Sequence, residues 1–202
     1  ERLRHDWFDA PYVAHAYEWQ DLSNISPHLQ QAVLAGEDQR FFTHQGFDFQ
    51  EIKVVLKQMM EGNPPRGAST ITMQAARSVF LPATRNPVRK LGEVWYTVIM
   101  ELIWDKHRIL EIYLNTVDWG TGIVGGQAGA RRYFETTASE LTRNQAAWMA
   151  AVLPSPHKWS PTDPTPFLEK RHQRILADMA HMPFLKGSDI EIVDKAGDQW
   201  GE

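Results

Sequence analysis

Apolar residues recur every three or four positions along most of this chain, which is the period of one face of an α-helix. The pattern predicts helices over residues 27–37, 49–61, 70–81, 87–102, 106–114, 143–153 and 166–179. No stretch alternates apolar and polar residues convincingly, as a strand would, and the sequence contains no internal repeat. The chain is therefore predicted to be mainly α.

Capping and helix-ending residues support these boundaries. Asp48 stands where an N-cap of the second helix is needed, and Thr142-x-x-Gln145 is the pattern of a capping box. Pro64-Pro65 should end the second helix, because proline cannot continue one. The glycine-rich stretch 120–129 is predicted to be a loop.

The helix predicted over residues 87–102 has two different faces. The face opposite its apolar stripe carries Arg89 and Glu93, four residues apart. Two interpretations of Glu93 stay open: a solvated ion pair, worth roughly a few tenths of a kcal/mol, or a functional acid. The stripe consists of Leu91, Trp95, Val98 and Leu102.

Composition narrows the class of protein. A chain of 202 residues with 43% hydrophobic and 23% charged residues is typical of one soluble globular domain. The net charge of −4 predicts no nucleic-acid partner, and the absence of cysteine excludes disulfides and thiolate catalysis. No run reaches the roughly 18–20 apolar residues of a membrane span. Because the sequence starts at Glu1, we expect it to be the extramembrane part of a longer protein.

Residues 37–48 hold the densest group of reactive side chains. Glu37 and Asp38 follow an apolar helical run, and a base, a histidine and several aromatic residues surround Gly46. At the end of a buried helix, burial raises the pKa of one carboxyl while its neighbour stays ionised, which suits proton transfer. A plain helix end with a structural His44 is the alternative.

A second polar block, Arg66–Gln74, is basic and rich in hydroxyls, and a third acid, Glu93, follows Arg89-Lys90. Two acids that flank such a loop indicate sugar-phosphate chemistry, although the hydroxyls could simply cap a helix. No His-x-x-x-His pair occurs, and we predict no dedicated transition-metal site.

The order of five motifs decides between these interpretations. They are Glu-Asp-x-x-Phe-x-x-His-x-Gly-x-Asp (37–48), Gly-x-Ser-Thr-Ile-Thr-x-Gln (67–74), Arg-Lys-x-x-Glu (89–93), Lys-x-x-Ile-Leu-Glu-x-Tyr-Leu-Asn (106–115) and Leu-Pro-x-Pro…Ser-Pro (153–161). Over residues 20–180 this series resembles the peptidoglycan glycosyltransferases of glycosyltransferase family 51. It is most similar to the monofunctional biosynthetic transglycosylases, and it also resembles the polymerase domain of class A penicillin-binding proteins.

The resemblance implies a fold and an activity. The fold would be a lysozyme-like helical head, with a smaller membrane-proximal jaw lobe at about residues 49–88, within a single domain spanning 1–202. The activity would be polymerisation of lipid II into β-1,4-linked glycan with inversion at the sugar, releasing undecaprenyl pyrophosphate. Glu37 matches the family's catalytic base and Glu93 its second glutamate.

The resemblance also implies binding groups. No organic cofactor is expected, and a divalent cation, Mg²⁺ or Mn²⁺, could sit at the donor pyrophosphate. Arginine is well suited to phosphate because its guanidinium binds phosphate oxygens bidentately. The candidate substrate-binding residues are Asp38, Arg40, Phe41, His44, Ser69, Thr70, Gln74, Arg77, Arg85, Arg89 and Lys90.

Residues 54–65 are expected at a membrane surface. Leu56, Met59 and Met60 stand beside Lys53 and Lys57, a composition suited to a lipid interface, although the apolar side chains could instead face the core. The resemblance implies the outer, periplasmic face of the bacterial inner membrane and an N-terminal transmembrane anchor. Expected partners are lipid II, the lipid-linked glycan, the membrane surface and other cell-wall synthesis proteins.

Two other functions stay open at this point. A lysozyme-like peptidoglycan hydrolase would also use a glutamate in a helical cleft, but its leaving group is a neutral sugar and needs no basic cluster. A non-catalytic cell-wall scaffold is the third possibility, and the presence of both Glu37 and Glu93 argues against it.

Overall fold

The helices follow the predicted boundaries closely. The computed structural model describes residues 17–63, 67–82, 87–186 and 189–191, so Arg85 and Pro64-Pro65 lie outside the described residues. All seven predicted helices are confirmed to within two residues at either end. The helices are η1 (Leu22–Asn24), α2 (Pro27–Glu37), α3 (Phe49–Met60), α4 (Ile71–Phe80), α5 (Pro87–Ile103), α6 (Lys106–Thr116), α7 (Gly126–Phe134), α8 (Arg143–Val152), α9 (Pro166–Asp178) and η2 (Met179–His181).

The predicted caps are present. The Asp48 carboxylate accepts a hydrogen bond from the backbone N–H of Glu51 at 2.9 Å, so it caps α3. Thr142 and Gln145 form the full capping box of α8. These side chains satisfy N–H groups that have no partner within the first turn of a helix.

The chain is mainly α as predicted, and it also contains short strands that the sequence pattern did not indicate. Strand β1 (Asp118–Gly120) pairs antiparallel with β2 (Ile123–Val124), and β3 (Phe184–Lys186) pairs antiparallel with β4 (Asp189–Glu191). Two or three residues are too few to show an alternating pattern, which is why sequence periodicity missed them.

The glycine-rich stretch 120–129 is also more ordered than predicted, because α7 starts within it. Gly125 has φ +83°, and a Cβ there would lie 2.7 Å from the Asn115 carbonyl oxygen. A Cβ on Gly129, inside the helix, would lie 2.5 Å from Cε of Met149. Gly125 allows close approach of a backbone carbonyl and Gly129 of the Met149 side chain, so these glycines do not mark a free loop.

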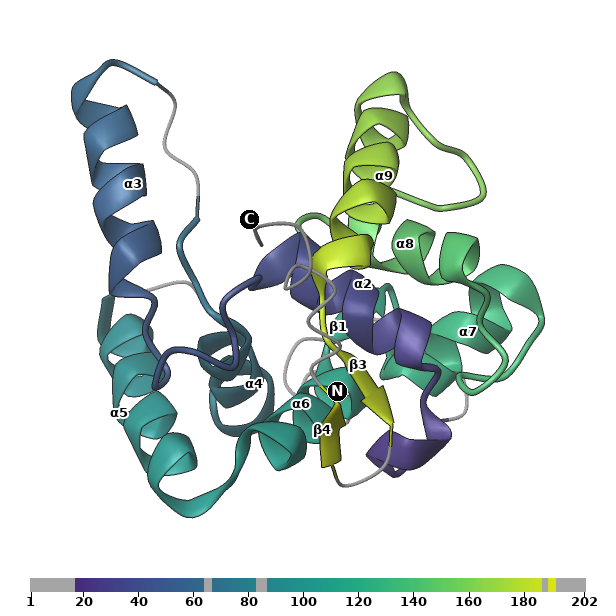
Figure 1. Ribbon diagram of the computed structural model, residues 1–202, viewed down its shortest axis with the longest axis horizontal. Coiled ribbons are helices and arrows are strands. Elements are labelled where there is room, and N and C mark those ends of the chain that lie inside the picture. The colour runs from purple at the N-terminus through teal and green to yellow at the C-terminus, as the bar shows by residue number, and fades with distance from the viewer. Residues whose placement is uncertain (1–16, 64–66, 83–86, 187–188, 192–202) are drawn as a thin grey trace, which may run out of the picture.

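The larger part of the molecule, which we call the head, contains α2, α6, α7, α8 and α9 (Figure 1). Within the head, helix α2 packs against α8 and α9. Four alanines of α8 are fully buried and let the helices approach closely: Ala146, Ala147, Ala150 and Ala151. This dense packing fixes the C-terminal end of α2, where Glu37 lies.

The smaller part, the small lobe, consists of α3, α4 and α5 and stands on the left of Figure 1. Helix α4 contacts both α5 and α6, so it joins the small lobe to the head. Helix α3 buries only Val55 among its residues, and Met60 is 89% exposed. The alternative that Leu56, Met59 and Met60 face the core is therefore wrong.

Helix α5 is oriented with its apolar stripe outward. Leu91, Trp95 and Leu102 are exposed, whereas Glu93 on the opposite face is 1% exposed. The interpretation of Glu93 as a solvated surface pair is therefore wrong. Among the described residues, no helix combines the length and apolar character needed to cross a membrane.

Candidate active site

Glu37 is the last residue of α2 and is held by two other helices. Its Oε2 accepts a hydrogen bond from Nε2 of Gln74 on α4 at 2.9 Å. Its Oε1 accepts one from Nη2 of Arg171 on α9, also at 2.9 Å. The Glu37 side chain is 12% exposed, so one carboxylate is oriented from two sides in a nearly dry position.

Burial raises the pKa of the Glu37 carboxyl above its ordinary value. The hydrogen bond from Gln74 and the charges of Arg171 and Arg77 lower the pKa, and the charge of Asp38 raises it. The net effect is a raised pKa. This suits a general base, because a base is most effective when its pKa lies near the working pH.

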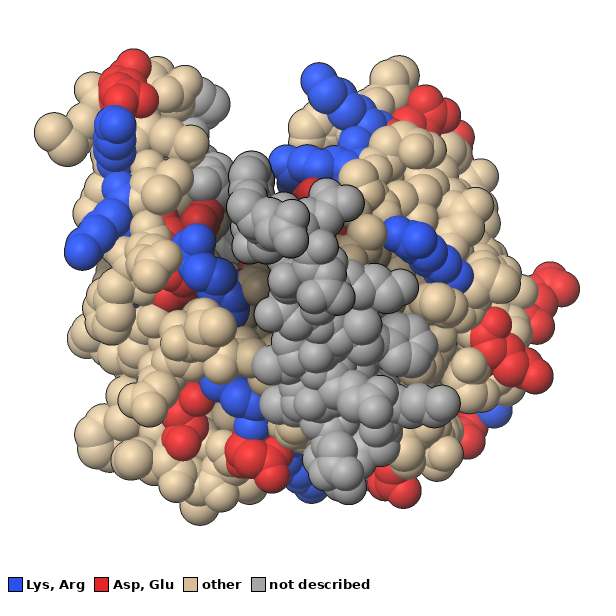
Figure 2. Space-filling model, in the orientation of Figure 1, with Lys and Arg blue, Asp and Glu red and all other residues tan. Residues whose placement is uncertain are grey.

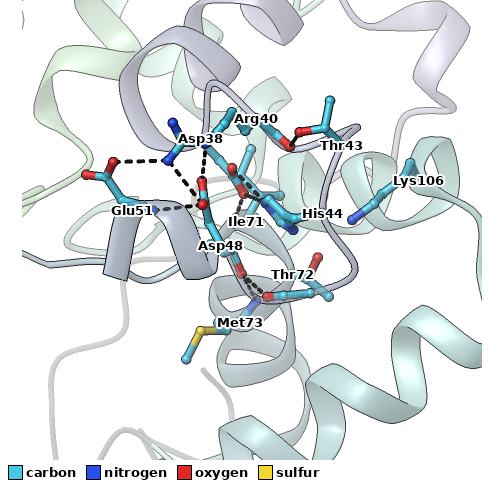
Figure 3. Close-up of polar contacts among 12 residues, drawn as sticks. Asp38, Arg40, Thr43, His44, Asp48, Glu51, Ile71, Thr72, Met73 and Lys106 are labelled. Carbon is cyan, nitrogen blue, oxygen red and sulfur yellow. Dashed lines mark hydrogen bonds and ion pairs between the residues drawn. The ribbon is translucent and has the colours of Figure 1, made fainter. Parts of the chain in front are cut away.

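Asp38 serves a different purpose from its neighbour. Its carboxylate accepts from the backbone N–H of Ile71 at 2.9 Å, in the first turn of α4. Nε2 of His44 lies 2.9 Å from Oδ1 of the same carboxylate (Figure 3). Asp38 thus ties the end of α2 to the start of α4, which places Gln74 beside Glu37.

Other residues of the first motif also support this junction. Arg40 donates to Asp48 at 2.8 and 3.1 Å and to Glu51 at 3.3 Å, so its guanidinium points to the start of α3 (Figure 3). Phe41 is buried in the core, with Nζ of Lys106 4.5 Å from its ring centroid.

Thr70 is buried as well. Its hydroxyl donates to the Gly46 carbonyl at 2.6 Å and accepts the backbone N–H of Met73, capping α4. In this arrangement Phe41, His44 and Thr70 hold the motif together from inside. Their contact with substrate remains a prediction.

Asp38, His44 and Asp48 form a trio whose ligand atoms all lie within 4.8 Å of one another. Most of their polar atoms bind within the protein, Asp38 with Ile71 and His44 and Asp48 with Arg40, while Nδ1 of His44 is buried without a hydrogen-bond partner. These internal bonds give the trio a structural role at the junction of α2, α3 and α4.

Glu93 lies on the buried face of α5 amid cations. Nη1 of Arg89 is 2.5 Å and Nζ of Lys90 2.8 Å from its carboxylate. Lys90 also donates to the Ser69 hydroxyl at 3.4 Å, which brings the second motif to the same place.

Arg77 connects the two acids. Its Nη1 is 4.0 Å from Oε1 of Glu93, and its charge lowers the pKa of Glu37. The side chain is 41% exposed, so it can also meet a ligand. Lys and Arg side chains stand on both sides of the hollow between the small lobe and the head (Figure 2). The site can therefore accept a proton at Glu37 and stabilise an anion beside the cations that surround Glu93.

Sequence reasoning missed Arg171. A signal was present, since Leu168 and Ile175 are three positions before and four after it and are fully buried. An arginine on the apolar face of an amphipathic helix needs a buried partner, and here that partner is Glu37.

Most of the chain matches a known protein family. The model of the transglycosylase family matches residues 9–180. This chain belongs to the transglycosylase family.

Relatives cover most of the chain. A biosynthetic peptidoglycan transglycosylase of Pseudomonas entomophila (strain L48) is 44% identical over 182 residues, which are 90% of this chain and 77% of the relative. One of Shewanella oneidensis is 43% identical over 173 residues, 86% of this chain and 74% of the relative. The family match over residues 9–180 spans the part of the chain that holds Glu37, Glu93 and Arg171.

Proposed function

We propose that this transglycosylase polymerises lipid II into β-1,4-linked glycan strands of peptidoglycan. The observation that carries the proposal is the pairing of two acids in opposite environments. Glu37 has a raised pKa, and Glu93 is enclosed by Arg89, Lys90 and Arg77. Family membership and the biosynthetic relatives support the same reaction.

In the proposed reaction Glu37 acts as the base. It takes the proton from the acceptor 4-hydroxyl while that oxygen attacks the anomeric carbon of the donor sugar. The bond to the pyrophosphate breaks on the opposite face, so an α-linked donor gives a β-linked product. Glu37 is aimed by Gln74 and Arg171, which reduces the cost of reaching this geometry.

The leaving pyrophosphate carries negative charge that must be stabilised. Arg77, Arg89 and Lys90 supply cations around Glu93, and Arg85, outside the described residues, is assigned to the same group. Glu93 orients these cations through its own ion pairs. A Mg²⁺ or Mn²⁺ ion would arrive with the substrate phosphates, and no side chain is assigned to it.

We propose that the reaction takes place at the membrane surface, on the periplasmic face of the inner membrane. Exposed apolar residues on α3 and α5 support this, because large apolar surfaces on a folded domain mark interaction sites. The residues are Phe49, Val54, Leu56, Met59 and Met60 on α3, and Val88, Leu91, Trp95, Val98, Leu102 and Ile103 on α5. Other cell-wall synthesis proteins remain proposed partners.

One assay separates the proposed function from its two alternatives. The protein is incubated with lipid II in detergent or liposomes, and separately with finished sacculi, and the products are resolved by gel and chromatography. Glycan ladders are expected. Soluble muropeptides from sacculi would indicate a hydrolase, and no product from either substrate would indicate a scaffold.

A further inference from the structure

Arg171 is fixed by three hydrogen bonds before any substrate arrives. Its Nε donates to the Ala151 carbonyl at 3.2 Å, and its Nη2 donates to the Gly36 carbonyl at 3.1 Å and to Glu37 at 2.9 Å. The side chain is 13% exposed, similar to Glu37 itself. A guanidinium held by two backbone carbonyls has little freedom to leave the carboxylate.

The backbone of α2 leaves room for this contact. A Cβ on Gly36 would lie 3.2 Å from Cδ1 of Ile175 and 3.6 Å from Nη2 of Arg171. Glycine at this position therefore permits α9 to approach the turn that carries Glu37. The contact joins residues 134 positions apart in the chain.

The charged and polar groups around Glu37 come from three helices and from Asp38, the residue that follows α2. Helix α4 contributes Gln74 and Arg77, α6 contributes Tyr113, and α9 contributes Arg171. Burial lowers the pKa of Arg171 and the charge of Glu37 raises it, and an arginine remains charged over the working range. Arg77 is 41% exposed and is screened by water, whereas Arg171 touches the carboxylate.

We propose that Arg171 is a positioning residue that keeps the buried Glu37 carboxylate ionised and aimed at the acceptor hydroxyl. The proposal rests on the proposed function only where it invokes the acceptor. Without Arg171, burial is opposed mainly by the neutral Gln74 amide and the exposed Arg77, so Glu37 holds its proton to higher pH. A protonated Glu37 cannot accept the proton of the incoming hydroxyl.

The test is the pH dependence of polymerisation in Arg171→Gln and Arg171→Lys. In Arg171→Gln the acid limb of the rate profile is expected to move up by about one pH unit or more, because removing an adjacent opposite charge has that effect. Raising the pH should then restore part of the activity. Arg171→Lys keeps the charge, so its acid limb should stay near that of the unsubstituted enzyme while the maximal rate falls.

Lys170→Gln is the matched control, since Lys170 lies on the same helix and is exposed. Its profile should match that of the unsubstituted enzyme. Thermal melting checks that each variant folds. If Arg171→Gln does not fold, the rate profile and the Glu37 titration are measured in Arg171→Lys.

A second measurement does not depend on catalysis. Carboxyl ¹³C NMR titration, with the Glu37 signal assigned by its absence in Glu37→Gln, should show Glu37 titrating at higher pH in Arg171→Gln. An unchanged titration would overturn the role given to Arg171, as would identical rate profiles for the lysine and glutamine variants. A lack of polymer from the unsubstituted enzyme would contradict the proposed function and leave the titration result standing.

Discussion

At the scale of single residues, two glutamates of the same chemistry have different surroundings. Glu37 meets one arginine and one amide in a nearly dry site, and its pKa is raised. Glu93 meets Arg89 and Lys90 directly. Different environments allow identical side chains to take different roles, here the proposed base and the proposed partner of the phosphate-binding cations.

Glu37→Gln should abolish polymerisation while the fold is retained. Loss of a general base typically lowers the rate by about 10²–10⁴. The amide is nearly isosteric and its oxygen still accepts a bond from Arg171 or Gln74, so the protein should fold, with a lower melting temperature because the other donor loses its acceptor. The measurement is the rate of glycan synthesis from lipid II, with circular dichroism as the folding control. Activity near that of the unsubstituted enzyme would remove Glu37 from the base role.

Arg77→Ala should weaken binding of a pyrophosphate-bearing lipid more than binding of lipid-free glycan. Charge-assisted bonds to phosphate are the strong ones, and only the lipid-linked ligand offers them. Arg85→Ala is expected to behave in the same way. Affinities are compared by titration with both ligands, with exposed Arg132→Ala on the head as the control. An equal loss for the two ligands would make Arg77 a structural or sugar-binding residue.

At the scale of elements, the first motif works as a junction between helices. Asp38 ties the end of α2 to the start of α4, and Asp48 caps α3 while pairing with Arg40. The density of polar residues in 37–48 thus serves the arrangement of three helices as well as the reaction. Sequence alone could not separate these uses.

Asp48→Ala should destabilise the protein by about 1–2 kcal/mol, the usual cost of a lost N-cap. Asp48→Asn should cost less, because asparagine also caps helices. Burial raises the pKa of Asp48, but hydrogen bonds from Arg40 and the Glu51 N–H outweigh it, and the net pKa is lowered.

A lowered pKa means that the Asp48 contribution is present above the unfolded value of about 3.9 and is lost as pH falls through the lower folded value. Urea unfolding at pH 7 and at progressively lower pH measures this effect. The difference between Asp48→Asn and the unsubstituted protein should shrink as the pH falls. A constant difference would show that the charge of Asp48 does not stabilise the fold.

At the scale of the whole molecule, most of the large exposed apolar side chains lie on α3 and α5 of the small lobe, and Phe167 on α9 is an exception in the head. Replacing Leu56, Met59 and Met60 by serine should lower liposome co-sedimentation and polymerisation together. Stability should hold, because these side chains are exposed in the folded protein. Val55→Ser is the contrasting variant, since Val55 is buried and its loss should lower the melting temperature.

Serine substitutions at Leu91, Trp95 and Leu102 extend the same test to α5, where the apolar stripe is also exposed. Anionic lipid should strengthen binding through Lys53 and Lys57 by roughly 1 kcal/mol each, and salt should weaken it. Unchanged co-sedimentation in both sets of variants would show that neither helix contacts lipid.

The sequence alone determined seven of the helices and drew attention to the two candidate acids. Helix periods and caps depend on neighbours within about four residues, so α2, α3 and α8 could be predicted with their ends. Glu37 and Glu93 could be identified because ordered motifs carry them.

Tertiary structure decided which face of each helix is buried and which distant residues meet. The pattern of α5 defines a polar and an apolar face, but only packing against α4 determines that Glu93 is inside and Trp95 outside. Arg171 reaches Glu37 across 134 positions because α9 packs on α2. Such contacts depend on how helices assemble, and the local period of a sequence holds no information about a partner so far along the chain.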